Sequence, residues 1–196
     1  MSSTPSTAST EGDVRSLVAA VVAAVVPEEP PPDAALAPDG PTAASLADIA
    51  IGADHGGFRL KERIARDLRE HGFTVHDCGT DSADSVDYPD FAHAVARLVA
   101  GGGTRWGIVV DGAGIGSAIT ANKVPGIRAA TCWDVSSARN SREHNHANVL
   151  ALGAGLIGEA LALQIVQAWL STPWGGDRHA RRVGQITLIE RQYART

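Results

Sequence analysis

Short apolar segments alternate with amphipathic segments along the chain from residue 48 onward. Runs such as Ile49–Ala53 have the length of buried strands, whereas Phe58–His71 carries apolar residues every three or four positions, as a helix does. Alternating strands and helices build a parallel sheet that is covered on both faces. We therefore predict an α/β fold, a three-layer α/β/α sandwich around a five-stranded parallel sheet of the Rossmann or flavodoxin-like type. The expected strands are 49–53, 73–76, 106–110, 127–131 and 149–152, and the expected helices are 58–71, 91–100, 135–143, 159–170 and 179–193, with another ending at 123.

The segment before the first strand differs in composition from the rest of the chain. Residues 13–26 place valine and leucine at the spacing of one helical face, which predicts a short amphipathic helix that ends before Pro27. Residues 27–47 are rich in proline and predict an extended linker. We therefore divide the chain into an N-terminal extension, residues 1–47, and a domain, residues 48–196.

Three interpretations of the predicted helix over residues 13–26 remain open. A signal peptide would begin with basic residues, but Glu11 and Asp13 precede the apolar run. The helix could instead pack on its own domain, because a helix this short is marginal in water without a partner surface. We favour the third interpretation, in which the helix is tethered by the linker and docks on another protein.

The overall composition excludes several classes of protein. The chain has 196 residues, 44% of them hydrophobic, and a net charge of −5, which is typical of a soluble protein without a nucleic-acid surface. No apolar run reaches the ~20 residues of a membrane span. Cys78 and Cys132 lack the spacing of a metal or redox motif and are expected to be free thiols in the cytoplasm.

The strongest chemical signal follows the third predicted strand. The segment Gly112-Ala-Gly-Ile-Gly116 can turn its backbone N–H groups toward an anion, and Asp111 stands directly before it. In a flavodoxin-like sheet, ligands bind where strands one and three end, so Asp54 and His55 are expected beside Asp111. Asp111 could act as a base if burial raised its pKa, or it could only cap the following helix.

Cofactor and metal sites are not indicated by the sequence. The glycine segment lacks the spacing of a dinucleotide fingerprint and follows the third strand instead of the first. His144 and His146 have no further ligand in register, so they make a weak metal site. We therefore predict a protein that works without a cofactor.

Two more groups of residues are candidates for binding an anionic ligand. His144 and Asn145 follow the fourth predicted helix, and we expect them at the carboxyl edge of the sheet as well. Arg178 and Arg182 lie one helical turn apart at the start of the last helix. Such a pair is often a solvated surface, but it also suits a phosphate.

Several of these segments are motifs that occur together between residues 48 and 190. They are Gly52-Ala-Asp-His-Gly-Gly-Phe58, Asp77-Cys-Gly-Thr80, Val86-Asp-Tyr-Pro-Asp90, Gly112-Ala-Gly-Ile-Gly116, Ala121-Asn-Lys-Val-Pro-Gly-Ile-Arg128, Arg142-Glu-His-Asn145 and Gly176-Asp-Arg-His-Ala-Arg-Arg182. In combination they resemble ribose-5-phosphate isomerase B and the related galactose-6-phosphate isomerase subunits. The extension resembles the encapsulation peptides that direct cargo to the shell of a bacterial microcompartment.

The resemblance implies an aldose–ketose isomerase of sugar phosphates that forms an enediolate without a metal. It also implies a homodimer or a dimer of dimers in which each site is completed by the neighbouring subunit. A location in the cytoplasm, or inside a microcompartment there, would follow. The implied roles are catalysis by Asp111 and His144, with His144 opening the sugar ring; substrate binding by Asp54, His55, Tyr88, Gly112, Gly114, Gly116 and Asn145; and phosphate binding by Arg178 and Arg182.

The chain departs from the family pattern at several positions of the implied site. Asp111 stands where the catalytic cysteine is usual, and Ser117 stands where some members carry a glutamate base. Ala113 replaces a hydroxyl residue, and Gly155 replaces an arginine that contacts phosphate. We expect ribose 5-phosphate as the first substrate, with a different four- to six-carbon sugar phosphate, or a non-catalytic or hetero-oligomeric binding subunit, as the alternatives.

Overall fold

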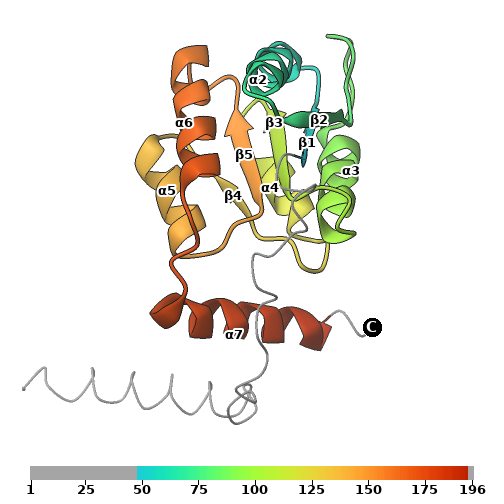
Figure 1. The fold of residues 1–196 in the computed structure, drawn as a ribbon. Helices are drawn as coiled ribbons and strands as arrows, with labels where there is room; N and C mark the ends of the chain where they lie inside the picture. The colour runs from blue at the N-terminus through green and yellow to red at the C-terminus, as the bar shows by residue number, and fades with distance from the viewer. Residues whose placement is uncertain (1–47, 194–196) are drawn as a thin grey trace, which may run out of the picture. The chain divides into compact units, whose positions relative to one another are not determined.

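The computed structural model describes residues 48–193, so the predicted helix over residues 13–26 and the linker lie outside the described residues. The described chain forms five strands and six helices in alternation (Figure 1). They are β1 (Asp48–Ala53), α2 (Phe58–Glu70), β2 (Thr74–Asp77), α3 (Tyr88–Ala100), β3 (Trp106–Asp111), α4 (Ile115–Ala121), β4 (Ala129–Thr131), α5 (Val135–Glu143), β5 (Val149–Gly153), α6 (Glu159–Ser171) and α7 (Asp177–Tyr193).

The predicted α/β fold is confirmed, and most elements begin and end within two residues of their expected bounds. The largest difference is α3, which begins at Tyr88, before the expected residue 91. Asp87 is extended and Pro89 lies in the first turn, where a missing N–H costs nothing. Pro89 is therefore compatible with the start of the helix, although a proline in a sequence usually indicates that a helix is interrupted.

All strand pairs are parallel, and the strand order is β2-β1-β3-β5-β4. A flavodoxin-like sheet would place β4 beside β3. Here β5 lies between them, but the neighbouring positions of β1 and β3 are as expected. The crevice predicted between the ends of these two strands therefore remains.

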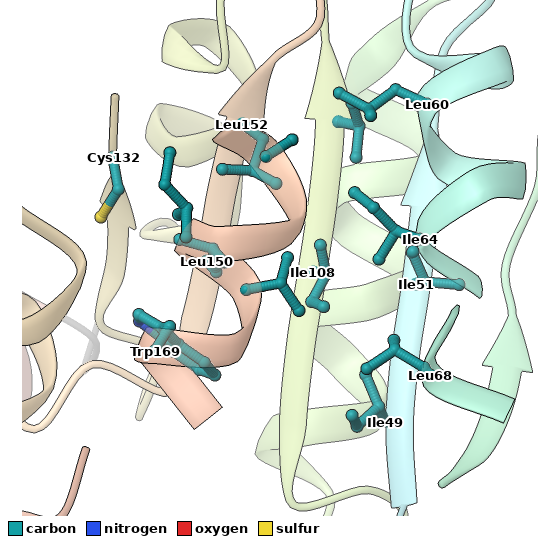
Figure 2. Packing of buried hydrophobic residues seen from close by; sticks show 14 of the residues in the cluster. Ile49, Ile51, Leu60, Ile64, Leu68, Ile108, Cys132, Leu150, Leu152 and Trp169 are labelled. Atoms are coloured by element: carbon teal, nitrogen blue, oxygen red, sulfur yellow. The ribbon is translucent and has the colours of Figure 1, made fainter. Parts of the chain in front are cut away.

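Two hydrophobic clusters, one on each face of the sheet, form the core of the described domain. Figure 2 shows the larger cluster, in which Leu60, Ile64 and Leu68 of α2 face Ile49, Ile51 and Ile108 of the sheet. Trp169 of α6 is fully buried in the same cluster. The other cluster joins α3 and α4 to the opposite face of the sheet. Among the described residues, no helix is long and apolar enough to cross a membrane.

The parallel sheet has two distinct edges. We call the edge where the strands end the carboxyl edge, and the edge where they begin the amino edge. The loops after β1 and β3 lie at the carboxyl edge. Residues 144–148 directly precede β5, so they lie at the amino edge, and the arrowhead of β5 in Figure 1 points away from α7.

Candidate functional site

The loop after β1 packs directly against the end of β3. Asp54 donates its N–H to the carbonyl of Val110 at 3.3 Å, and its Oδ1 accepts the N–H of Gly57 at 2.9 Å. A Cβ on Gly57 would lie 2.2 Å from the oxygen of Val110, so only glycine allows this approach. The predicted convergence of Asp54 with the end of β3 is therefore confirmed.

His55 and Tyr88 complete the same side of the carboxyl edge. The Nδ1 atom of His55 lies 3.1 Å from the carbonyl oxygen of Val86, which ties the histidine to the segment before α3. The ring of Tyr88 covers the glycine loop, because a Cβ on Gly116 would lie only 2.6 Å from Tyr88 Cζ. Asp54, His55, Tyr88, Asp111 and the loop 112–116 thus lie together, and we call them the carboxyl-edge group.

The glycine loop is fixed by contacts with β5. Gly114 has a left-handed backbone, with φ of 77°, and a Cβ there would meet the backbone of Leu152 at 2.9 Å. Gly155 donates its N–H to the carbonyl of Gly112 at 2.9 Å. Gly155, where the family resemblance implies a phosphate-binding arginine, therefore contributes to the loop through its backbone N–H.

Asp111 is almost completely buried, with 4% of its surface exposed. Its Oδ1 accepts the N–H groups of Ala113, at 2.7 Å, and of Gly114, and its Oδ2 accepts the N–H of Ser117 at 3.0 Å. Burial raises the pKa of this carboxyl group, but the side chain of Ser117 and the three N–H groups lower it further than burial raises it. The net pKa lies below the ordinary value, so Asp111 is ionised at neutral pH.

These contacts change two expectations about the loop. Asp111 supplies the acceptor for the first turn of α4, although the N-cap residue itself is Gly114. The N–H of Gly114, expected to face a substrate oxygen, already donates to Asp111. A carboxylate that acts as a base near neutral pH works better with a raised pKa, whereas the pKa of Asp111 is lowered.

A second group of candidate residues lies where α5 ends and α7 begins. The ring of His144 stacks on the ring of His179 with centroids 4.3 Å apart, and Arg178 Nε donates to His179 Nε2 at 3.2 Å. Asn140 Nδ2 lies 2.9 Å from His144 Nδ1, and Asn145 Nδ2 donates to Asn140 at 3.3 Å. We call His144, Asn145, Arg178, His179 and Arg182 the amino-edge group.

The amino-edge group is suited to an anion. Desolvation lowers the pKa of His179, and the nearby His144, Arg178 and Arg182 lower it further, whereas Glu143 acts in the opposite direction. Removing positive charge from this cluster is therefore favourable, and a bound anion would relieve the same repulsion. His179 was not singled out in the sequence; its place between Arg178 and Arg182 in one motif was the available signal.

The expected position of His144 at the carboxyl edge is wrong. α5 runs back along the sheet, so His144 precedes β5, whereas Asp111 pairs with Gly153, the last residue of β5. The four residue steps from Val149 to Gly153 correspond to about 13 Å at ~3.3 Å per residue. Within one chain, the carboxyl-edge and amino-edge groups therefore lie at opposite edges of the sheet and cannot serve one small substrate.

Potential metal ligands and the two cysteines complete the set of candidate residues. Within residues 48–193, no set of three histidine, cysteine or acidic side chains is arranged to hold a metal ion. Cys78 and Cys132 are free thiols, and burial raises the pKa of each above its ordinary value. The side chains of the two groups are carboxylates, imidazoles, a phenol, an amide and guanidinium groups, beside the backbone N–H groups of the glycine loop.

Comparisons with known proteins agree with the fold and the motifs. The family model described as Ribose/Galactose Isomerase matches residues 49–186. The ribose-5-phosphate isomerase B of Escherichia coli (strain K12) is 49% identical over 144 residues, which cover 74% of this chain and 97% of that protein. The Mycobacterium tuberculosis protein of the same name is 43% identical over 148 residues, covering 74% of this chain and 91% of that protein.

Solved structures give the same result. The ribose-5-phosphate isomerase B of Clostridium thermocellum has a TM-score of 0.74 and 53% identity, covering 74% of this chain and 99% of that one. A Mycoplasma genitalium ribose-5-phosphate isomerase B with bound ribulose-5-phosphate has a TM-score of 0.71 and 35% identity, covering 74% and 97% of the two chains. The chain therefore belongs to the Ribose/Galactose Isomerase family of aldose–ketose isomerases.

Proposed function

We propose that the protein interconverts ribose 5-phosphate and ribulose 5-phosphate. The observation that carries this proposal is the carboxyl-edge group, in which Asp111, the glycine loop and Tyr88 meet in one place. Relatives at 43–53% identity are named as this isomerase, and a 35% identical relative is described with ribulose-5-phosphate bound.

The proposed reaction moves one proton between two neighbouring carbons. His144, with Asn145 beside it, opens the sugar ring. Asp111 takes the proton from C2 of the open aldose, and the electrons of the C–H bond form the enediolate. The N–H groups of Gly112 and Gly116 hold the enediolate oxygen O1. The hydroxyl proton on O2 passes to O1, and returning the carbon-bound proton from Asp111 to C1 completes the ketose.

The remaining candidate residues bind the substrate in this proposal. Asp54, His55 and Tyr88 contact the sugar hydroxyl groups at the carboxyl edge. Arg178 and Arg182 bind the phosphate through charge-assisted hydrogen bonds. His179 lies between the two arginines and keeps Arg178 oriented through the 3.2 Å hydrogen bond.

We further infer that each site is built from two copies of the chain. The carboxyl-edge group of one copy would meet the amino-edge group of another, because neither edge holds all the required residues. Exposed apolar side chains occur near both groups, which is typical of surfaces that a partner covers. They are Ile115, Ile119 and Leu156 near the carboxyl edge and Ile186 and Ile189 on α7. A homodimer, or a dimer of dimers, meets this requirement.

A second candidate function is a sugar-phosphate-binding subunit without activity of its own. The observation in its favour is the Asp111 carboxylate, whose two oxygens are already held by the loop and by Ser117. Assaying the purified full chain against four- to six-carbon aldose phosphates separates the two functions. Turnover by the chain alone supports the isomerase, and the highest kcat/KM identifies the sugar. Tight binding without turnover contradicts the isomerase and favours the subunit.

We also propose that residues 13–26 direct the protein to a microcompartment shell. The support is the amphipathic spacing and the proline-rich segment that follows it. The full chain should co-purify with shells when both are produced in one host. Replacing Leu17 and Val21 with glutamate should abolish co-purification without changing isomerase activity. Equal recovery of the wild type and of the glutamate variant with the shells would contradict the proposal.

A further inference from the structure

The segment between α6 and α7 contacts the chain on both sides of the candidate ring-opening residue. Gly175 donates its N–H to the carbonyl oxygen of Glu143 at 3.0 Å. The ring of Trp174 stacks on the ring of His146, with the centroids 4.7 Å apart and an angle of 20° between the planes. Glu143 and His146 flank residues 144–145 in the chain. Two neighbouring residues of one segment therefore hold both ends of this short stretch.

His146 has a backbone conformation that residues other than glycine rarely adopt. Its φ is 51°, and such a left-handed residue persists where its surroundings hold it in place. The His146 N–H donates to the carbonyl oxygen of Arg142 at 3.1 Å, and the His146 carbonyl oxygen accepts Arg128 Nε at 2.8 Å. Only 8% of the residue is exposed, and its ring lies on Trp174. These contacts fix the direction in which the chain leaves Asn145.

The same segment also lies close to the end of α5 and to the stacked histidine rings. A Cβ on Gly175 would lie 2.7 Å from the carbonyl oxygen of Glu143, so a larger residue would push the segment and the end of α5 apart. The ring centroid of Trp174 lies 6.3 Å from that of His179, which in turn stacks on the ring of His144. Support for His144 therefore comes both through the backbone and through a neighbouring ring.

We propose that Trp174 and Gly175 are positioning residues, which hold His144 in place for the opening of the sugar ring. The proposal rests on the proposed function, in which His144 opens the ring. A group that transfers a proton works within about 3 Å of its target atom, and a displacement near 1 Å can cost about 100-fold in rate. Contacts that prevent such a displacement therefore contribute to kcat.

The phosphate-binding arginines are anchored independently of Trp174. Val183, which follows Arg182 on α7, is fully buried, and Glu190 of the same helix accepts the N–H of Gly126 at 2.9 Å. These contacts hold α7 on the domain when the ring of Trp174 is lost. A displaced ring-opening histidine therefore predicts a lower kcat with KM nearly unchanged, whereas a displaced α7 would raise KM as well.

Substitutions of Trp174 separate ring stacking from apolar bulk. Trp174→Phe keeps an aromatic face for His146, whereas Trp174→Leu keeps apolar volume without an aromatic face. We expect Trp174→Leu to lose about tenfold to 100-fold in kcat for ribose 5-phosphate, with KM changed less than about threefold. Trp174→Phe should regain most of the lost kcat. Wild-type kcat in Trp174→Leu, or an equal loss in both variants, would overturn the proposal.

Glycine substitutions disturb the same contacts without removing a side chain. Gly175→Ala places a Cβ against the carbonyl oxygen of Glu143 and should lower kcat about fivefold to tenfold. Gly184→Ala on α7 is the matched control, because a Cβ there meets no atom within 4 Å, and its kcat should equal that of the wild type. Equal kcat in the two alanine variants contradicts the proposal. Urea unfolding identifies any variant that fails to fold, and the remaining variants then carry the comparison.

A deuterium isotope effect shows which step of the reaction has become slow. Deuterium at C2 of ribose 5-phosphate slows the removal of the proton but not the opening of the ring. Ring opening should limit the rate in Trp174→Leu, so the isotope effect on kcat should fall toward unity. A general loosening of the site would slow both steps and leave the isotope effect at its wild-type size, which would refute a specific role in ring opening.

A measurement without substrate separates this proposal from the proposed function. The ring signals of ¹⁵N-labelled histidines in the full chain report the surroundings of His144 by NMR. The His144 signal should shift in Trp174→Leu and in Gly175→Ala, and the second variant keeps every aromatic ring, so its shift reports a displacement. An unshifted His144 signal in Gly175→Ala overturns the positioning proposal whether or not the wild type is active. Absent turnover by the wild type contradicts only the proposed function.

Discussion

Mixing two inactive variants tests the shared site most directly. Asp111→Asn removes the base of the carboxyl-edge group, and His144→Gln removes the ring-opening residue of the amino-edge group. Within one chain the two groups are separated by the length of β5, about 13 Å for its four residue steps. Acid–base groups have to lie within about 3 Å of the substrate atoms they serve. If both groups act on one substrate, as proposed, they therefore have to come from different copies of the chain.

The expected activity follows from random assembly of the two variants. When both are produced in equal amounts in one cell, half of the carboxyl-edge groups are intact, and half of these meet an intact amino-edge group. About a quarter of the wild-type activity per chain should therefore return, for a dimer or for a dimer of dimers. The assay is the conversion of ribose 5-phosphate to ribulose 5-phosphate by the purified mixture, with each variant alone as the baseline.

A second mixture makes the result decisive. Wild-type chains assembled with chains that carry both substitutions should also give about a quarter of the activity if sites are shared. If each chain held a complete site, this mixture would give about half, and the first mixture would give only the baseline. That pair of results would refute the shared site and the edge assignment of His144.

Four further predictions concern single residues. Asp111→Asn should lower kcat by about 100-fold or more, because an amide cannot accept the proton. Wild-type activity should persist below the usual pKa of an aspartate, since the pKa of Asp111 is lowered and its carboxylate stays ionised there. Steady-state kinetics measured against pH checks both expectations. The stability that Asp111 adds should be present above its unfolded pKa, near 3.9, and be lost as pH falls through its lower folded value. Arg178→Ala should raise KM for sugar phosphates by about tenfold to 100-fold, whereas Arg181→Ala, an exposed neighbour on α7, should leave KM unchanged. Trp169→Ala should lower the free energy of unfolding by about 3–5 kcal/mol in urea titrations, and the exposed Arg66→Ala should change it little.

Much of the carboxyl-edge group could be predicted because its placement depends on strand order. Asp54 and Asp111 each directly follow or end a buried apolar run, and parallel strands end at one edge. Once β1 and β3 are neighbours, the two residues have to converge. The prediction holds although β4 and β5 are exchanged relative to a flavodoxin-like sheet, because both strands lie on the side of β3 that faces away from β1.

The amino-edge position of His144 follows from the order of the predicted elements and not from its motif. A residue that follows a helix and precedes a strand lies where strands begin, since each helix returns the chain across the sheet. The hydrogen bonds of Asp111, in contrast, could not be predicted from the sequence. They depend on the left-handed turn at Gly114, which brings the N–H groups of residues 113, 114 and 117 to one carboxylate. Spacing along the chain shows that donors are present but not where they point.

The two groups also differ in charge, and this difference links substrate affinity to assembly. The carboxyl-edge group carries Asp54 and Asp111, and the nearby Lys61 is already paired with Asp77 at 2.6 Å. Gly155, where the family resemblance implies an arginine, has no side chain and supplies only a backbone N–H. In the proposed site the arginines that bind the phosphate therefore come from the amino-edge group of the other copy. If so, dilution below the dimer dissociation constant should abolish phosphate binding together with activity, whereas a site with its own arginine at position 155 would retain part of its affinity.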